Sequence, residues 1–197
     1  MNNEPILHID GYKLDHKRQY PEGTTRVYSN WTPRGSRVPG QNKVVFFGLQ
    51  YFLDQYITEN FDKDFFSRPL EQVAEKYVNA VNRYLGPNSI GVTHITDLHK
   101  LGYLPLEFKA LKEGTLCDLR VPMLTVENTD GKFFWLVNYF ETLLSSALWM
   151  PCTSATTAYR MRNLLDTYAH KTGGDLSLIH ISEPTRPCGT SRMPSSA

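Results

Sequence analysis

The run Ile6-Leu-His-Ile-Asp10-Gly-Tyr12-Lys13-Leu-Asp-His16-Lys-Arg18-Gln19-Tyr20-Pro21 joins an apolar segment to a carboxylate, a phenol and a basic segment. Its apolar part, Ile6 to Ile9, predicts a strand or an extended lead-in to the fold. Asp10 and Tyr12 follow at positions i and i+2, which lie on one side of an extended chain. A carboxylate can accept from an amide, and a phenol can stack on a flat heterocycle. The pair is therefore a candidate binding edge; the alternative is a carboxylate at a turn, with Tyr12 packed on the core.

A second candidate site lies in the loop after an aromatic strand. Arg26 to Trp31 alternates with Val, Tyr and Trp, which predicts a strand that ends at Pro33-Arg34-Gly35. The guanidinium of Arg34 stands on an accessible loop with Arg37 nearby, and such a group can bind phosphate through two parallel hydrogen bonds. A solvated basic loop is the alternative. The basic run from Lys13 to Arg18 permits the same two interpretations.

The rest of the chain mixes helices and strands in an irregular order. Alternation and β-branched residues predict strands at Lys43–Phe47, Leu104–Leu111 and Val121–Glu127. Apolar spacing of three and four residues predicts helices that begin near Leu49 and Pro69, and further helices at Thr93–Leu101, Lys132–Trp149 and Ser154–Lys171. Pro151 is expected to break the last two apart. Because strands and helices do not alternate strictly, the predicted fold class is α+β.

Two ionisable residues in these elements need an explanation. Glu141 lies inside an apolar helix, and a buried carboxylate requires a partner. Asn138, Arg160 or Arg162 could be that partner, in a structural pair. His16 could be a metal ligand or a base, but no second histidine or carboxylate stands at metal-ligand spacing from it.

Composition and charge exclude several classes of protein. The 197 residues carry 21 Lys and Arg against 20 Asp and Glu, a net charge of +1, so no global field favours nucleic acid or a membrane surface. The amino terminus lacks a basic region followed by an apolar segment, and no apolar stretch is long enough to span a membrane. A cytoplasmic location is expected. Cys117, Cys152 and Cys188 are widely spaced and predict reduced structural thiols.

The composition changes at Leu176, after which Ser, Pro and Thr dominate. Leu176 to Arg186 resembles the in-frame translation of a transposase sequencing adapter, and Ser191 to Ala197 resembles the translated primer sequence that follows it. We therefore expect residues 176–197 to be a non-native, disordered tail that has no part in the fold.

A series of short segments follows, in order, the pattern of a known enzyme family. The segments are Asp10-Gly-Tyr12-Lys13 with His16, Gln19-Tyr20-Pro21, Val27-Tyr28-Ser29, Pro33-Arg34, Phe47-Gly48-Leu49-Gln50-Tyr51, Leu104-Pro105-Leu106-Glu107, Thr125-Val126-Glu127-Asn128-Thr129, and Trp135-Leu136-Val137-Asn138 with Glu141-Thr142. No single segment is specific, but the ordered set is. On these segments the chain resembles the nicotinamide phosphoribosyltransferase family.

The resemblance implies an activity and a site. The full-length parent would be a glycosyltransferase (a pentosyltransferase) of NAD salvage, which makes nicotinamide mononucleotide and pyrophosphate from nicotinamide and phosphoribosyl pyrophosphate. Family members are homodimers whose sites are shared between subunits. By resemblance, Tyr12 stacks on the nicotinamide ring, Asp10 lies near its carboxamide, and Arg34 approaches the phosphates, each across the dimer. Mg²⁺ and ATP are implied for the full-length enzyme, with no ligands identified in this chain.

The resemblance also implies how the chain is divided. Residues 1–130 would form the amino-terminal α+β domain of a type II phosphoribosyltransferase, and residues 131–175 the helices that lead into a truncated α/β barrel. Most of the catalytic residues would lie beyond this chain, so we expect the chain by itself to be inactive. Two alternatives stay open: a nicotinate phosphoribosyltransferase, since sister enzymes share an Asp-x-Tyr element, and a short non-catalytic dimerisation or ligand-binding module. The negative charge of Asp10 favours nicotinamide over the nicotinate anion.

Overall fold

The computed structural model describes residues 4–174 and divides the chain into two compact units, Met1–Thr156 and Thr157–Ala197. The division falls inside the last helix, α6 (Glu141–Thr172). The tail expected at residues 176–197, with Cys188, lies outside the described residues. Within residues 4–174, none of the helices combines the length and the apolar character that crossing a membrane requires.

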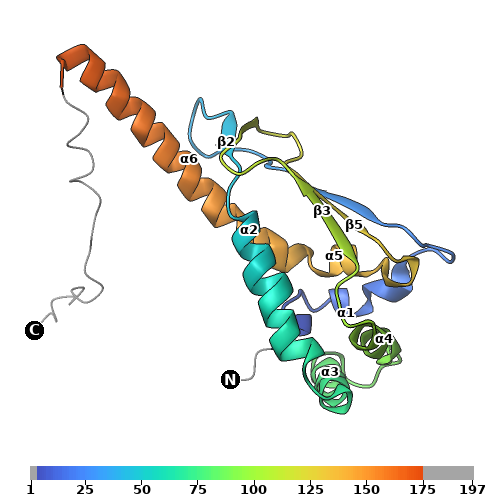
Figure 1. The fold of residues 1–197 in the computed structure, drawn as a ribbon. Coiled ribbons are helices and arrows are strands. Elements are labelled where there is room, and N and C mark those ends of the chain that lie inside the picture. The colour runs from blue at the N-terminus through green and yellow to red at the C-terminus, as the bar shows by residue number, and fades with distance from the viewer. Residues whose placement is uncertain (1–3, 175–197) are drawn as a thin grey trace, which may run out of the picture. The chain divides into compact units, whose positions relative to one another are not determined.

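A three-stranded antiparallel sheet lies at the centre of the first unit (Figure 1). Its strands are β1 (Tyr28–Trp31), β5 (Leu124–Asn128) and β3 (Leu106–Ala110), with β5 in the middle. A second, two-stranded antiparallel sheet pairs β2 (Lys43–Val45) with β4 (Leu116–Asp118). The strands predicted after residue 25 are confirmed as shorter elements, with β5 ending one residue later than predicted, and β4 is one that the sequence pattern did not reveal.

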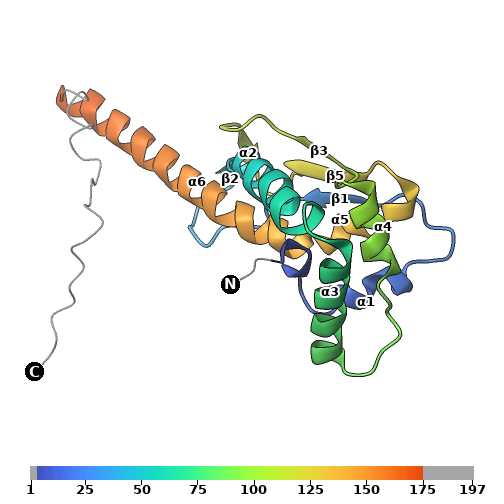
Figure 2. The ribbon, with the colours of Figure 1, turned by 60° about the horizontal axis from the view of Figure 1, so that its bottom comes forward.

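The helical elements surround the sheets in an irregular order, which confirms the α+β class. They are the 3₁₀ helix η1 (Pro5–Leu7), α1 (Lys13–His16), the 3₁₀ helix η2 (Lys17–Gln19), α2 (Leu49–Phe52) with its π-helical continuations η3 (Leu53–Asn60) and η4 (Asp62–Phe66), α3 (Leu70–Leu85), α4 (Thr93–Leu101), the 3₁₀ helix η5 (Gly131–Phe133), α5 (Leu136–Tyr139) and α6. Helices α3 and α4 lie side by side in both views (Figures 1 and 2). Helix α5 packs on β1 and β5, and α1 packs on α5.

Helices α3 and α4 are confirmed, and local signals specify both ends of α3 and the carboxyl end of α4. Helix α3 begins directly after Pro69 and ends at Gly86, whose φ is 70°. Helix α4 ends at Gly102 in the left-handed conformation that glycine adopts without a steric cost. The face of α3 that enters the core contains the buried residues Val73, Tyr77 and Val81.

Three local predictions are wrong. The single helix expected at Lys132–Trp149 is divided into η5, α5 and the beginning of α6. Tertiary packing decides the other two. Ile6 to Ile9 is not a strand: Pro5 stands in the first turn of η1, and the Leu7 N–H donates to the Glu4 carbonyl at 2.9 Å. Pro151 does not break the helix, since α6 runs through it. Leu148 and Cys152, on either side of it, are buried in the core, so packing compensates for the backbone hydrogen bond that proline cannot donate.

Gly48 makes room for this proline. A β-carbon at Gly48 would lie 2.7 Å from the Cβ of Pro151, closer than non-bonded carbons approach. Gly48 also has a φ of 102°, and its N–H donates to Glu113 Oε1 at 3.0 Å. The segment between β2 and α2 can therefore lie directly on α6 at Pro151 only with glycine at this position.

The first unit has two hydrophobic cores, and the segment after residue 130 contributes to both. Phe133, Trp135, Leu136, Tyr139 and Phe140 belong to the core that also contains the buried faces of α3 and α4. Val137, Leu144, Leu148 and Cys152 belong to the core beneath the sheet and α2. Residues 131–156 therefore pack within the first unit; that residues 131–175 lead into a barrel stays a prediction. Cys117 and Cys152 are buried free thiols.

The second unit is described from residue 157 to residue 174 and is helical as far as Thr172. An ion pair of 2.9 Å joins Arg162 to Asp166 one turn later. Five large apolar side chains on this segment are exposed: Tyr159, Met161, Leu164, Leu165 and Tyr168.

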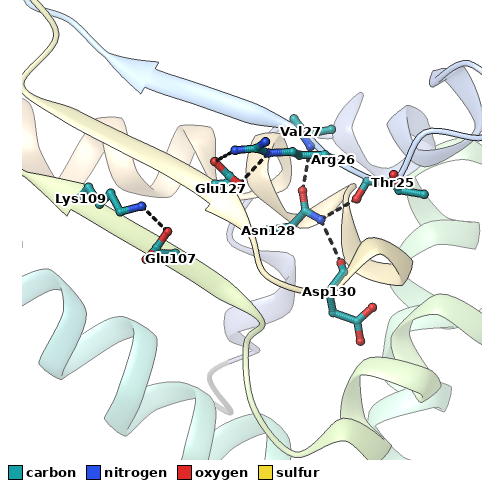
Figure 3. Close-up of polar contacts among 8 residues, drawn as sticks. All are labelled: Thr25, Arg26, Val27, Glu107, Lys109, Glu127, Asn128 and Asp130. Atoms are coloured by element: carbon teal, nitrogen blue, oxygen red, sulfur yellow. Dashed lines mark hydrogen bonds and ion pairs between the residues drawn. The ribbon is translucent and has the colours of Figure 1, made fainter.

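Asn128, at the end of β5, connects the segment before β1 to the turn after β5 through side-chain hydrogen bonds (Figure 3). Its side-chain oxygen accepts from the Val27 N–H at 2.8 Å. Its amide donates to the carbonyls of Thr25, at 2.8 Å, and Asp130, at 3.0 Å. Since Asn128 is buried, water cannot replace these partners when the side chain is removed.

Asn128→Ala should therefore lower the free energy of unfolding by about 2–3 kcal/mol, because it leaves buried backbone groups unpaired. Urea unfolding followed by circular dichroism measures the change. The matched control is Asn30→Ala on β1, where the exposed asparagine accepts one hydrogen bond, from Thr32. Equal losses for the two variants would show that Asn128 does not fasten the segments together.

His94 on α4 is buried in an aromatic group. Its Nε2 lies 3.1 Å from the Tyr77 hydroxyl, and its ring meets Trp135 nearly edge-on at 5.0 Å between centroids. Burial lowers the pKa of His94 to about 4, the positive charge of Lys17 acts in the same direction, and Asp97 opposes both. The histidine is therefore neutral in the folded protein at neutral pH.

Stability should fall as the pH drops from about 6.5 to 4, because in this interval the unfolded chain binds a proton at His94 that the folded protein excludes. The full loss corresponds to about 3 kcal/mol for a shift of this size. Urea titrations at pH 7 and pH 4.5 measure it, and His94→Gln should make the pH dependence shallower. Parallel pH profiles for the variant and the wild type would exclude His94 as the cause.

Candidate functional site

The segment from Asp10 to Lys13 forms a turn at the start of α1. The Lys13 N–H donates to the Asp10 carbonyl at 2.9 Å, and Tyr12 has helical backbone angles. The extended geometry expected for Asp10 and Tyr12 is therefore wrong, because the chain already begins its helical turn here. The two residues nevertheless occupy one turn.

The first turn of α6 holds this segment at two points. The Thr142 hydroxyl donates to Asp10 Oδ2 at 2.6 Å. Lys13 is only 3% exposed, and its Nζ lies 2.5 Å from Glu141 Oε2, while the side chain of Glu141 is 61% exposed. The buried ammonium therefore depends on a carboxylate that reaches it from the surface.

Tyr12 lies between these two anchored positions and directs its ring outward. Its side chain is 56% exposed, which excludes the alternative of a tyrosine packed on the core. The His16 ring lies 5.1 Å from its centroid in a tilted arrangement, and Lys13 Nζ lies 5.2 Å from it. An exposed phenol on an anchored turn can stack on a flat ligand without a large loss of conformational entropy.

Gly11, between Asp10 and Tyr12, is in close contact with Tyr84 of α3. A β-carbon at Gly11 would lie 2.1 Å from Tyr84 Cζ, so a larger residue would displace the tyrosine ring. A cavity of about 230 Å³ lies beside this contact, lined by Leu7, Ile9, Gly11, Leu14, Ala80 and Tyr84. The turn is therefore packed against α3 as well as bonded to α6.

Arg34 is exposed in the loop between β1 and β2. The segment before β5 supports the base of this loop: the Arg120 N–H donates to the Pro33 carbonyl at 2.7 Å, and the Met123 N–H to the Trp31 carbonyl at 3.0 Å. Within residues 4–174 the guanidinium makes no hydrogen bond or ion pair and has no contact with Asp10 or Tyr12. The structure thus brings Asp10 and Tyr12 together and leaves Arg34 on a separate loop, available to an anion.

The basic run after Tyr12 is not a uniformly solvated face. Lys13 is buried against Glu141, and burial lowers the pKa of Lys17. Arg18 lies 2.5 Å from Asp15 and lowers the pKa of that carboxyl through its hydrogen bond. For His16 the described residues provide no metal site, because no group of three or more potential ligands occurs among them.

The partner predicted for Glu141 is wrong. Asn138 instead bonds to Ser29 and Tyr20, and the partner of Glu141 is Lys13, 128 positions earlier. The apolar sequence around Glu141 indicates a paired carboxylate, but residue spacing does not locate a partner so far away. Residue spacing does not identify Thr142 as a contact of Asp10 either; the signal available for it is its place in the Glu141-Thr142 segment.

Mg²⁺ and ATP, implied for the full-length enzyme, stay predictions. Potential metal-binding side chains do not cluster in groups of three or more between residues 4 and 174. Tyr12, Asp10 and Arg34 offer a ring, an acceptor and a cation, which suit a polar aromatic ring and a phosphate rather than a metal ion.

Comparison with known proteins identifies the family. The family model described as the nicotinamide phosphoribosyltransferase N-terminal domain matches residues 5–108, which is more than half of the chain. The chain therefore belongs to the nicotinamide phosphoribosyltransferase family. The nicotinamide phosphoribosyltransferase of Acinetobacter baylyi is 48% identical over 182 residues, which cover 90% of this chain and 36% of that protein.

More distant relatives agree with this assignment. The nicotinamide phosphoribosyltransferase of Mycoplasma genitalium is 31% identical over 191 residues, which cover 89% of this chain and 42% of that protein. The crystal structure of human nicotinic acid phosphoribosyltransferase matches with a TM-score of 0.57 and 19% identity, over 78% of this chain and 28% of that chain. This last match shows the fold alone. The chain spans between a third and a half of the length of these curated relatives.

The buried Lys13 ammonium leads to a prediction about Glu141. Glu141→Gln should lower the free energy of unfolding by about 1–2 kcal/mol, because a charge-assisted hydrogen bond to a buried cation is lost. The matched control is Glu107→Gln, which removes the same charge from an exposed pair with Lys109 and should have a much smaller effect. Urea unfolding measures both variants. If both lose the same amount, the Lys13–Glu141 pair stabilises no more than a surface ion pair.

Proposed function

We propose that this chain is the amino-terminal part of a nicotinamide phosphoribosyltransferase of NAD salvage. In this pentosyl transfer a bond forms between the pyridine nitrogen of nicotinamide and the anomeric carbon of phosphoribosyl pyrophosphate, and the bond from that carbon to pyrophosphate breaks. The observation that carries the proposal is the outward-facing Tyr12 ring beside the Asp10 carboxylate, on one anchored turn of a chain that belongs to this family.

Each site residue has a chemical role in this proposal. Tyr12 stacks on the nicotinamide ring, and Asp10 accepts from the carboxamide N–H through the oxygen that Thr142 leaves unoccupied. Arg34 binds phosphate through its guanidinium. The parent is a cytoplasmic homodimer in which these residues complete the partner's site. Support for this arrangement is the exposure of Tyr12 and Arg34 and their separation on different loops.

The remaining parts of the proposal concern residues outside this chain. Mg²⁺ and ATP, if the parent uses them, are bound by such residues. Because the chain covers 36% of its Acinetobacter baylyi relative, we propose that it is inactive by itself.

The complete gene product should form nicotinamide mononucleotide and prefer nicotinamide to nicotinate. To obtain it, the reading frame is followed past the codon for Asp175 in genomic DNA, and the full protein is expressed. Steady-state rates with nicotinamide and nicotinate are then compared at saturating phosphoribosyl pyrophosphate. A higher kcat/KM with nicotinate would assign the protein to the sister activity, and a stop codon at this point would favour the short non-catalytic module.

A further inference from the structure

Thr142 differs from four other threonines of α6 in the acceptor to which its hydroxyl donates. The hydroxyls of Thr153, Thr156, Thr167 and Thr172 each donate to the backbone carbonyl four residues earlier in the same helix. This local bond is the usual one for threonine inside a helix. The Thr142 hydroxyl donates instead to Asp10, 132 positions away in the sequence, at 2.6 Å.

This hydrogen bond fixes one oxygen of the Asp10 carboxylate and leaves the other oxygen available as an acceptor. Asp10 Oδ2 accepts from Thr142, and among residues 4–174 no hydrogen bond or ion pair engages Oδ1. A carboxylate has acceptor capacity on both oxygens. The half-buried side chain therefore presents its second oxygen in a defined direction, held by the first turn of a helix rather than by a loop.

The same helical turn also sets the position of Tyr12 relative to Asp10. Glu141, the neighbour of Thr142, pairs with Lys13, the residue that follows Tyr12. Gly11, which lies between Asp10 and Tyr12 in the chain, is packed against Tyr84. Two consecutive residues of α6 therefore hold the chain on both sides of the exposed ring, so the acceptor and the stacking surface keep one mutual geometry.

From this arrangement we propose that Thr142 is a positioning residue, which orients Asp10 toward the carboxamide of the ring substrate. It acts through Asp10 and does not touch the substrate itself. The inference rests on the proposed function and adds to it the residue that sets the preference for a ring bearing an amide N–H. Without the hydroxyl, the carboxylate can rotate away, and a site built to accept from an N–H loses its discrimination.

The test uses the complete gene product with three variants. Thr142→Val removes the hydroxyl and keeps the β-branched shape, and Thr142→Ser keeps the hydroxyl. Thr167→Val is the matched control, because it removes a threonine hydroxyl that bonds to the carbonyl of Asn163 in its own helix. Each variant is assayed for KM and kcat with nicotinamide, and for competitive inhibition by 3-acetylpyridine, which has the ring and the carbonyl but a methyl group in place of the amide nitrogen.

Thr142→Val should raise KM for nicotinamide about tenfold, as expected for the loss of one hydrogen bond to a charged group, and leave kcat nearly unchanged. The inhibition constant of 3-acetylpyridine should not change, because this molecule has no N–H for Asp10 to accept. Thr142→Ser should restore the wild-type KM, and Thr167→Val should match the wild type throughout.

Other outcomes would contradict the inference in distinct ways. If Thr142→Val weakens nicotinamide and 3-acetylpyridine by the same factor, together with a lower melting temperature, Thr142 is structural only. If all its constants equal those of the wild type, the bond to Asp10 has no role in substrate recognition. If the wild-type gene product itself makes no nicotinamide mononucleotide, the proposed function fails, and this inference fails with it.

Discussion

The ion pair between Lys13 and Glu141 is the interaction on which the amino-terminal turn depends. A lysine side chain that is 3% exposed needs a close polar partner in place of water, and for Lys13 that partner is the carboxylate of Glu141. This requirement ties the start of α1 to the start of α6. The turn that carries Asp10 and Tyr12 is consequently held by a helix that is itself anchored in the first unit: its residues Leu144, Leu148 and Cys152 belong to one hydrophobic core, and Leu143 packs against both.

This arrangement explains how an exposed residue can be precisely placed. The Tyr12 ring faces solvent, yet its neighbours on both sides are bonded or packed: Asp10 to Thr142, Gly11 to Tyr84, and Lys13 to Glu141. The turn loses its conformational entropy when the protein folds, so ligand binding does not require this loss again. The binding edge that we propose for a second subunit would need this property, because its own subunit does not enclose it.

The fold shows where local preference gives way to packing. Proline is expected to end a helix, but Pro151 lies inside α6, with buried Leu148 and Cys152 around it and with Gly48 leaving space for its ring. The apolar lead-in Ile6 to Ile9 has the composition of a strand but forms a 3₁₀ turn in which Ile6 enters the core. In both cases the buried apolar surface outweighs the preference of the local sequence.

The sequence by itself determined the elements whose ends carry local signals and the family to which the chain belongs. Helices α3 and α4 stop at glycines, apolar and polar residues alternate in the strands, and an ordered set of short segments marks the family. Each of these signals is contained in a few neighbouring residues. The tertiary structure alone decided which distant side chains meet. The partner of Glu141 is 128 positions away and the partner of Asp10 is 132 positions away. Periodicity carries no information at such separations, because the contacts arise from how the helices pack and not from the order of residues along any one of them.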